Sequence, residues 1–181
     1  MANDLVTGFQ EELRDRLSGM LNDILDVYYK KLTTSSSKKP HPLPDDSGLV
    51  QSTRADEAVG IDFKDNSVLA YLHLKSTVWN VETGRRKGMV PWDGKNDANN
   101  PILMWVRKRR IESDPKRQKS AAWAIRKHIM EHGIPRTDYL EESINEVMRN
   151  KDYISEIESL GEEYVAGYIF KRLEAEDYFV L

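Results

Sequence analysis

The N-terminal 32 residues constrain the fold most, because they carry one unbroken helical period. From Asp4 to Leu32 an apolar side chain recurs every three or four residues, which is the spacing of one face of an α-helix. The spacing is nearer four than three and a half, so we expect this helix to pack on a sheet rather than to form a free coiled coil. The apolar positions are Leu5, Phe9, Leu13, Leu17, Leu21, Ile24, Tyr28 and Leu32.

A strand pattern follows between Ala58 and Leu74. Apolar residues take alternate positions in 59–63 and again in 68–74, and the polar stretch 64–67 lies between them. This alternation predicts an antiparallel hairpin with one face suited to receive the long helix. We therefore predict an α+β fold, in which a long N-terminal amphipathic helix packs on a small antiparallel sheet and several C-terminal helices follow.

The middle of the chain is predicted to contain short helices. The apolar stretch 77–81 is expected to be an edge strand or a short helix. Two helices are expected at 102–111 and 116–132, because Asp114 and Pro115 suit the start of the second helix and Gly133 suits its end.

Two further helices are expected toward the C-terminus. Asp138 and Glu141 resemble a capping box at the start of one, and the other covers 153–176. The expected apolar face of the first helix consists of Leu140, Ile144, Val147 and Met148. That of the second consists of Ile154, Ile157, Leu160, Tyr164, Tyr168 and either Phe170 or Leu173.

These elements suggest one domain with an appended arm. We expect residues 1–149 to form the α+β domain and residues 150–181 to form a helical arm with an apolar tail. The stretches 33–47 and 84–101 are rich in residues that break regular structure, so we expect both to be mobile loops.

Composition excludes several classes of site. The chain has no cysteine, so disulfide frameworks, thiolate zinc sites and cysteine nucleophiles are all excluded. It has no apolar segment of about 18 residues, so no membrane span is predicted. The first residues lack the basic start and apolar core of a signal peptide, so we expect the chain to be made and used in the cytoplasm.

Charge is distributed unevenly along the chain. The net charge of −3 combines −4 over residues 1–74, +9 over 75–130 and −8 over 131–181. A basic middle between acidic ends can bind nucleic acid, and it can equally bind the acidic part of an identical neighbour. Head-to-tail contacts of the second kind close into rings when the rotation between copies is right.

Two basic clusters are the candidate interface residues, and Trp105 and Trp123 lie among or near them. We favour contact with the acids of a neighbouring copy over contact with a DNA backbone, because the overall charge is negative and no base-reading motif is present. The apolar C-terminus is a further candidate, since an exposed apolar end favours docking. The candidates are Arg85, Arg86, Lys87, Arg107, Lys108, Arg109, Arg110, Tyr178, Phe179 and Leu181.

His128 to His132 matches the H-x-x-E-H pattern of inverted zinc peptidases. On a helix the two histidines share one face, and Glu131 could activate water. The alternative is a helix end, where histidine is favoured by the dipole and by the last carbonyls. We favour that account because Gly133 breaks the helix directly afterwards, and we assign no cofactor or metal.

The order of four short motifs resembles the minor tail component, or tail-completion protein, of tailed bacteriophages. The similarity covers residues 4–149, and its specificity comes from the joint order of the motifs. Ser47 stands where the family has threonine, and the acidic helix after Asn150 lies beyond the family's usual end. The motifs are Ser47-Gly48-Leu49 with Ser52, Val81 to Gly88, Trp105 to Lys108, and Ile129 to Glu142.

The resemblance implies a structural protein rather than an enzyme. Family members form rings in the virion neck, between the head connector and the tail, so the implied partners are copies of this chain and the neighbouring connector and tail proteins. Six copies are implied, with twelve as the alternative, and the packaged DNA would be close by. The alternatives are a nucleic-acid-binding accessory protein and, less favoured, the H-x-x-E-H metallohydrolase.

Overall fold

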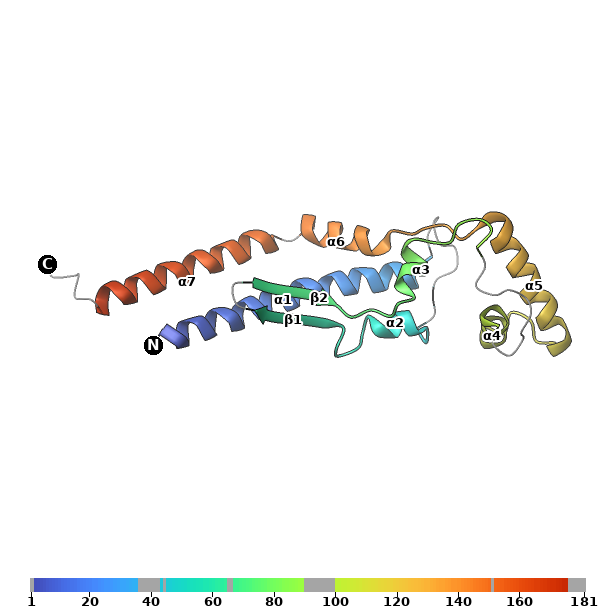
Figure 1. The fold of residues 1–181 in the computed structure, drawn as a ribbon, viewed down its shortest axis with the longest axis horizontal. Coiled ribbons are helices and arrows are strands. Elements are labelled where there is room, and N and C mark those ends of the chain that lie inside the picture. Colours follow the sequence, from blue (N-terminus) through green and yellow to red (C-terminus); the bar gives the residue numbers. More distant parts are fainter. Residues whose placement is uncertain are drawn as a thin grey trace. The chain divides into compact units, whose positions relative to one another are not determined.

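The computed structural model describes residues 2–35, 43, 45–64, 67–89, 100–150 and 152–175. The chain divides into two compact units (Figure 1). The helix–hairpin unit comprises Met1–Lys75 and Tyr139–Leu181, and the inserted unit comprises Ser76–Asp138. The second unit is an insertion between two halves of the first.

The helix–hairpin unit is built around α1 (Ala2–Thr33), which confirms the long helix predicted from the periodicity. Its buried side chains keep that period and include Leu25, which the prediction did not contain. Tyr28 and Leu32 are completely buried. The buried residues of α1 are Leu13, Leu17, Leu21, Ile24, Leu25, Tyr28 and Leu32.

The predicted hairpin is also present, as β1 (Val59–Lys64) and β2 (Ser67–Leu72). The strands pair antiparallel, with Ile61 opposite Ala70. Those two residues pack with Leu13 and Leu17 of α1, so the apolar face of the hairpin receives the helix as expected. The α+β fold class predicted from the sequence is thereby confirmed.

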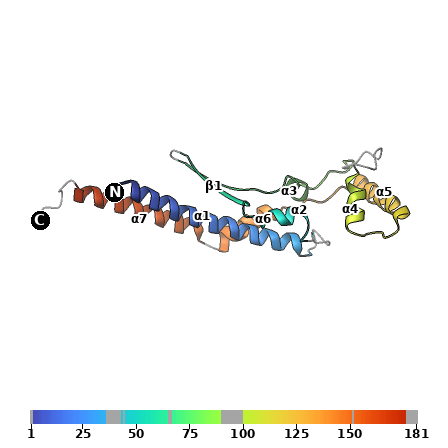
Figure 2. The same ribbon diagram turned by 90° about the horizontal axis from the view of Figure 1, so that it is seen from below.

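Two C-terminal helices complete the unit, α6 (Tyr139–Asn150) and α7 (Tyr153–Ala175). Both run along α1, as Figures 1 and 2 show. Val147 and Tyr153 join Leu21 and Ile24 in one apolar cluster, and Leu160 joins Leu13 and Leu17 in another. Burial of these apolar side chains is what holds the C-terminal helices to the N-terminal one.

Polar contacts set the position of these helices along α1. Arg16 of α1 pairs with Glu156 of α7 at 2.8 Å, and Lys31 pairs with Glu146 of α6 at 2.9 Å. Both pairs are partly exposed, so each contributes at most about 1 kcal/mol. The Tyr153 hydroxyl donates to Asp23 from within the apolar cluster, which satisfies a phenol that burial would otherwise leave without a partner.

The Ser47-Gly48-Leu49 motif begins the short helix α2 (Gly48–Ser52), which the Ser47 hydroxyl caps by accepting from the Val50 amide. One local prediction needs correction. The capping box is wrong in its first residue. The Asp138 carboxylate accepts from the Arg136 guanidinium, and the φ of +57° at Asp138 differs from the extended backbone of an N-cap.

The inserted unit contains α3 (Val78–Glu82), α4 (Pro101–Lys108) and α5 (Pro115–His132). The stretch 77–81 is therefore part of a short helix and not an edge strand. Asp114 caps α5 through the Lys116 amide, and Gly133 ends it with φ of +76°, as predicted. The helices α4 and α5 bury one apolar cluster consisting of Ile102, Leu103, Val106 and Ala122.

Two segments far apart in the sequence lie side by side, one near the first residues of the inserted unit and one near its last residues. The backbones of Arg85 and Ile134 exchange two hydrogen bonds of 2.8 and 2.9 Å. Thr137 adds bonds to the carbonyls of Val81 and Glu82, so the two ends of the insertion are joined to each other. The close approach requires Gly84, where a side chain would overlap the Ile134 carbonyl.

This organisation groups the residues differently from the division at residue 149. Residues 153–164 of α7 pack with α1 in the helix–hairpin unit. Residues 76–138 form the other unit, and its bounds lie close to those of the basic stretch 75–130. Within the part of the chain that the structure describes, no helix is both long and apolar enough to cross a membrane.

Candidate partner interface

The basic run at residues 107–110 lies at the end of α4. Asn100 caps this helix by accepting from the Leu103 amide at 3.0 Å, and Pro101 takes its first position. Because the helix ends at Lys108, the run places positive charge beside the last carbonyls, where the helix dipole favours it. The favourable interaction with the helix dipole is therefore one structural reason for basic residues at the end of α4.

Only part of this basic run is engaged within the chain. Arg107 donates to the side chain of Gln118 on α5 at 3.3 Å. Among the residues with described positions, neither Arg109 nor Arg110 has an ion-pair partner. Arg110 also has a positive φ of 50°, which turns the chain away from the helix. The structure thus leaves cationic side chains available to a partner at the α4–α5 junction.

The second basic cluster, Arg85 to Lys87, begins at the residue whose backbone pairs with Ile134. Arg85 is partly buried, and its guanidinium donates to Asn80 at 3.2 Å while its backbone bonds Ile134. Arg86 and Lys87 are exposed. Arg85 therefore has a structural role in this unit, and its two neighbours are the residues of this cluster that face solvent.

Large apolar side chains are exposed near the cations. Trp105 and Trp123 each keep nearly half of their surface exposed, and Met104 is exposed on α4. The Arg126 guanidinium lies over the Trp123 ring at 5.0 Å, a cation–π arrangement. The inserted unit thus combines exposed aromatic and cationic groups on the same two helices.

An exposed apolar row that the sequence pattern did not predict lies on α7. Ile154, which was assigned to the buried face, is 56% exposed, and Val165 and Ile169 are also exposed. The buried face instead consists of Tyr153 and Leu160, with Ile157 and Tyr164 partly buried. Apolar residues occur on two sides of α7, so periodicity alone could not say which side packs on α1.

The histidine pair at the end of α5 has the geometry of a helix terminus. The rings of His128 and His132 stack at 4.4 Å, and His132 Nδ1 lies 3.1 Å from the His128 carbonyl oxygen. Glu131 pairs with Lys127 at 3.8 Å. No cluster of three or more His, Cys, Asp or Glu that could hold a metal occurs among the described residues.

Several predicted features lie outside the described residues. These are Tyr178, Phe179 and Leu181 of the apolar C-terminus, residues 36–42 and 44 of the first loop, and residues 90–99 of the second. The candidate interface is therefore restricted to the two basic clusters and the exposed aromatic residues of α4 and α5.

The division into units sharpens the charge asymmetry seen in the sequence. The inserted unit holds 14 basic and 7 acidic residues, which gives it a net charge of +7. The helix–hairpin unit holds 13 basic and 23 acidic residues, which gives it −10. Charges of opposite sign therefore belong to separate compact bodies and not merely to separate stretches of sequence.

Comparison with protein-family models, with curated proteins and with solved structures gives no match to this chain.

Proposed function

We propose that the chain is a structural virion protein, a ring-forming neck or tail-completion subunit that joins the head connector of a tailed bacteriophage to its tail. The observation that carries the proposal is the segregation of charge, +7 on the inserted unit and −10 on the helix–hairpin unit. A chain with two oppositely charged bodies has complementary surfaces for head-to-tail contact with its own copies.

The arrangement of elements gives further support. The resemblance implies a long helix against an antiparallel sheet, and α1 packs on the hairpin in that way. Exposed aromatic residues beside cations, such as Trp123 under the Arg126 guanidinium, suit a protein interface, where tryptophan and arginine are enriched. The virion neck is inferred from the resemblance, and the head-to-tail contact is inferred from the charges.

The mass of the purified chain in solution tests the head-to-tail contact. Light scattering at about 0.05 M and about 1 M salt should show a large closed oligomer that dissociates as salt rises, because salt screens exposed charges. A second measurement adds the connector and tail proteins of the same virion. A chain that stays monomeric at low salt, alone and with those proteins, would contradict the proposal.

A nucleic-acid-binding accessory protein is the second candidate. The arrangement of Arg126 over Trp123, together with the cations of α4, is what favours it, since basic grooves with aromatic side chains bind single strands. Binding of DNA that falls steeply with salt, by a chain that remains monomeric, would favour this candidate over the ring subunit.

A further inference from the structure

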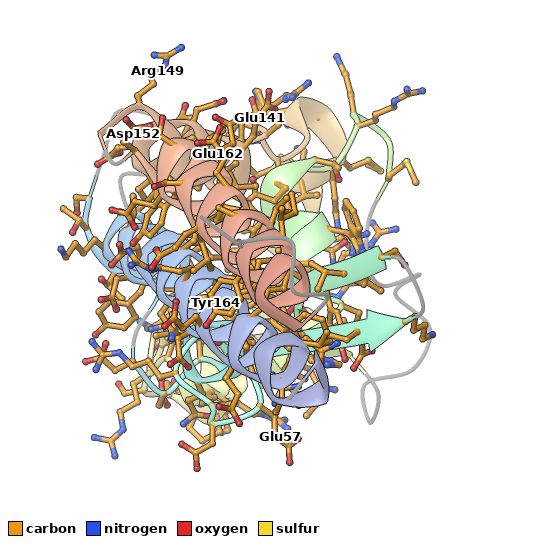
Figure 3. The ribbon with its side chains drawn as sticks, turned by 90° about the vertical axis from the view of Figure 1, so that its left-hand side faces the viewer. Glu57, Glu141, Arg149, Asp152, Glu162 and Tyr164 are labelled. Carbon is orange, nitrogen blue, oxygen red and sulfur yellow. The ribbon has the colours of Figure 1, made fainter. Side chains whose placement is uncertain are left out.

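One side of α7 carries a row of apolar residues with one acidic residue among them. Ile154, Glu158, Gly161, Val165 and Ile169 recur every three or four residues, so they share one face of the helix. The side of α7 that packs on α1 is a different one, and it includes Tyr164, which Figure 3 shows between the two helices. Three exposed branched aliphatic residues on one face, each at least half exposed, indicate a surface that a partner covers. We call this row the α7 stripe.

A row of opposite charge lies on α5. Lys116, Lys119, Trp123, Lys127 and Met130 also recur every three or four residues and share one face. This face lies away from Ala122, which is buried against α4. Trp123 is 46% exposed and Met130 is 40% exposed. We call this row the α5 stripe.

The two stripes match in length, and their antiparallel register brings together one pair of opposite charges and one small–large pair. Each extends over about 21–23 Å, because its 15 or 16 residues are separated by 14 or 15 rises of about 1.5 Å. In antiparallel register Ile154 comes opposite Met130, and Glu158 comes opposite Lys127, whose exposed ammonium also lies 3.8 Å from Glu131 on the same helix. Gly161, which has open space around its Cα, comes opposite the large ring of Trp123. A small residue opposite a large one is what close helix packing requires.

We propose that the α7 stripe of one copy binds the α5 stripe of the next copy, and that this contact is the repeating joint of the assembly. The inference rests on the proposed function and adds to it the surfaces that make the ring. The occupant is a second copy because the two units that carry the stripes have opposite net charges, −10 and +7. In the stated register the aliphatic stems of Lys119 and Lys116 come opposite Val165 and Ile169, and such stems can cover apolar surface. The contact joins two different surfaces, so it propagates from copy to copy and closes only through the rotation between them.

Charge exchange between the two stripes tests the contact. Lys127→Glu reverses the charge at the centre of the contact on the α5 stripe, and Glu158→Lys reverses it on the α7 stripe. Each variant alone should therefore lose assembly, with an association constant at least about tenfold lower. Mixing the two variants should restore assembly. In a ring in which the two variants alternate, each joint pairs either two unaltered stripes or two altered ones, so opposite charges meet at every joint. The double variant should also assemble alone. Native mass spectrometry reads the copy number and the composition of each species.

Matched controls make the same charge changes at exposed sites off both stripes. Lys64→Glu at the end of β1 and Glu57→Lys before that strand should leave the assembly unchanged. Figure 3 shows that Glu57 lies away from Glu162, a neighbour of the α7 stripe. Loss of assembly in these controls would mean that overall charge governs assembly, and it would overturn the specific contact.

The outcomes separate the contact from the proposed function. If the single variants assemble like the unaltered chain, the stripe contact is wrong while the ring subunit stands. If mixing fails to restore assembly and only the double variant regains it, the contact lies within one chain and the proposed joint is wrong. An unaltered chain that never assembles contradicts both. A further outcome would assign the α5 stripe to nucleic acid instead: Lys127→Glu loses binding of DNA, and Glu158→Lys leaves the mass of the assembly unchanged.

Discussion

Substitution of Leu103 by alanine should unfold the inserted unit selectively. Leu103 is completely buried between α4 and α5, in a cluster of only four buried residues. Leu→Ala substitutions in protein cores cost about 2–5 kcal/mol. Two short helices can close partly over the gap, so we expect the lower half of that range, about 2–3 kcal/mol.

That loss is large for a unit of this size. The inserted unit has 63 residues, and natural domains have about 0.05–0.15 kcal/mol of stability per residue, which gives about 3–9 kcal/mol. With a urea slope of about 1 kcal/mol per molar, the unfolding midpoint of the unit should fall by about 2–3 M. The control is Leu32→Ala, which removes an equally buried leucine from α1.

The distribution of aromatic residues allows the two units to be followed separately. All four tryptophans lie in the inserted unit and all eight tyrosines in the helix–hairpin unit. Tryptophan fluorescence in urea should therefore shift with Leu103→Ala and change little with Leu32→Ala, while tyrosine signals show the reverse. Equal shifts of both signals in both variants would show that the chain unfolds as one body, and the reasoning from two units would be refuted.

Three further predictions concern single sites. Gly84→Ala should destabilise the inserted unit by at least about 1 kcal/mol more than Gly88→Ala, as measured by tryptophan fluorescence in urea. Both glycines have a positive φ, but only at Gly84 would the added methyl group meet a carbonyl, that of Ile134. Equal effects of the two substitutions would contradict the close approach of the backbones at Gly84. Burial and the Glu12 carboxylate raise the pKa of Tyr164, so its contribution to stability is present below about pH 10 and is lost as pH rises through the higher folded value. An NMR titration should show this, with a lower pKa in Glu12→Gln; an unchanged value would remove Glu12 as a cause. Purified protein should hold no stoichiometric zinc by mass spectrometry, and His128→Ala should leave assembly intact; bound zinc that this variant loses would revive the hydrolase.

The features that the sequence predicted are those with a local physical cause. The period of α1 and the alternation in the hairpin follow from burial of one face, which each segment displays by itself. The start of α5 at Asp114 and its end at Gly133 follow from capping and from backbone conformation, which single residues determine. Such features need no knowledge of what the segment packs against.

The features that the sequence did not predict depend on contacts between distant residues. The Arg85–Ile134 pairing joins positions 49 residues apart through backbone groups, which every residue possesses. The side of α7 that packs on α1 could not be chosen because Ile154 and Tyr153 both offer apolar surface. For the same reason the predicted interface consisted of the two basic clusters and the apolar C-terminus, and the exposed apolar row on α7 emerged from the burial pattern in the folded chain.

We propose that copies of this chain join head to tail through oppositely charged surfaces. Cryo-electron microscopy of the purified protein at low salt tests it most directly, because one image series gives closure, copy number and the identity of the joined surfaces. We expect closed rings, of six copies or of twelve, in which α7 of each copy lies against α5 of the next. Monomers, open aggregates, or rings in which identical surfaces face each other would contradict the account.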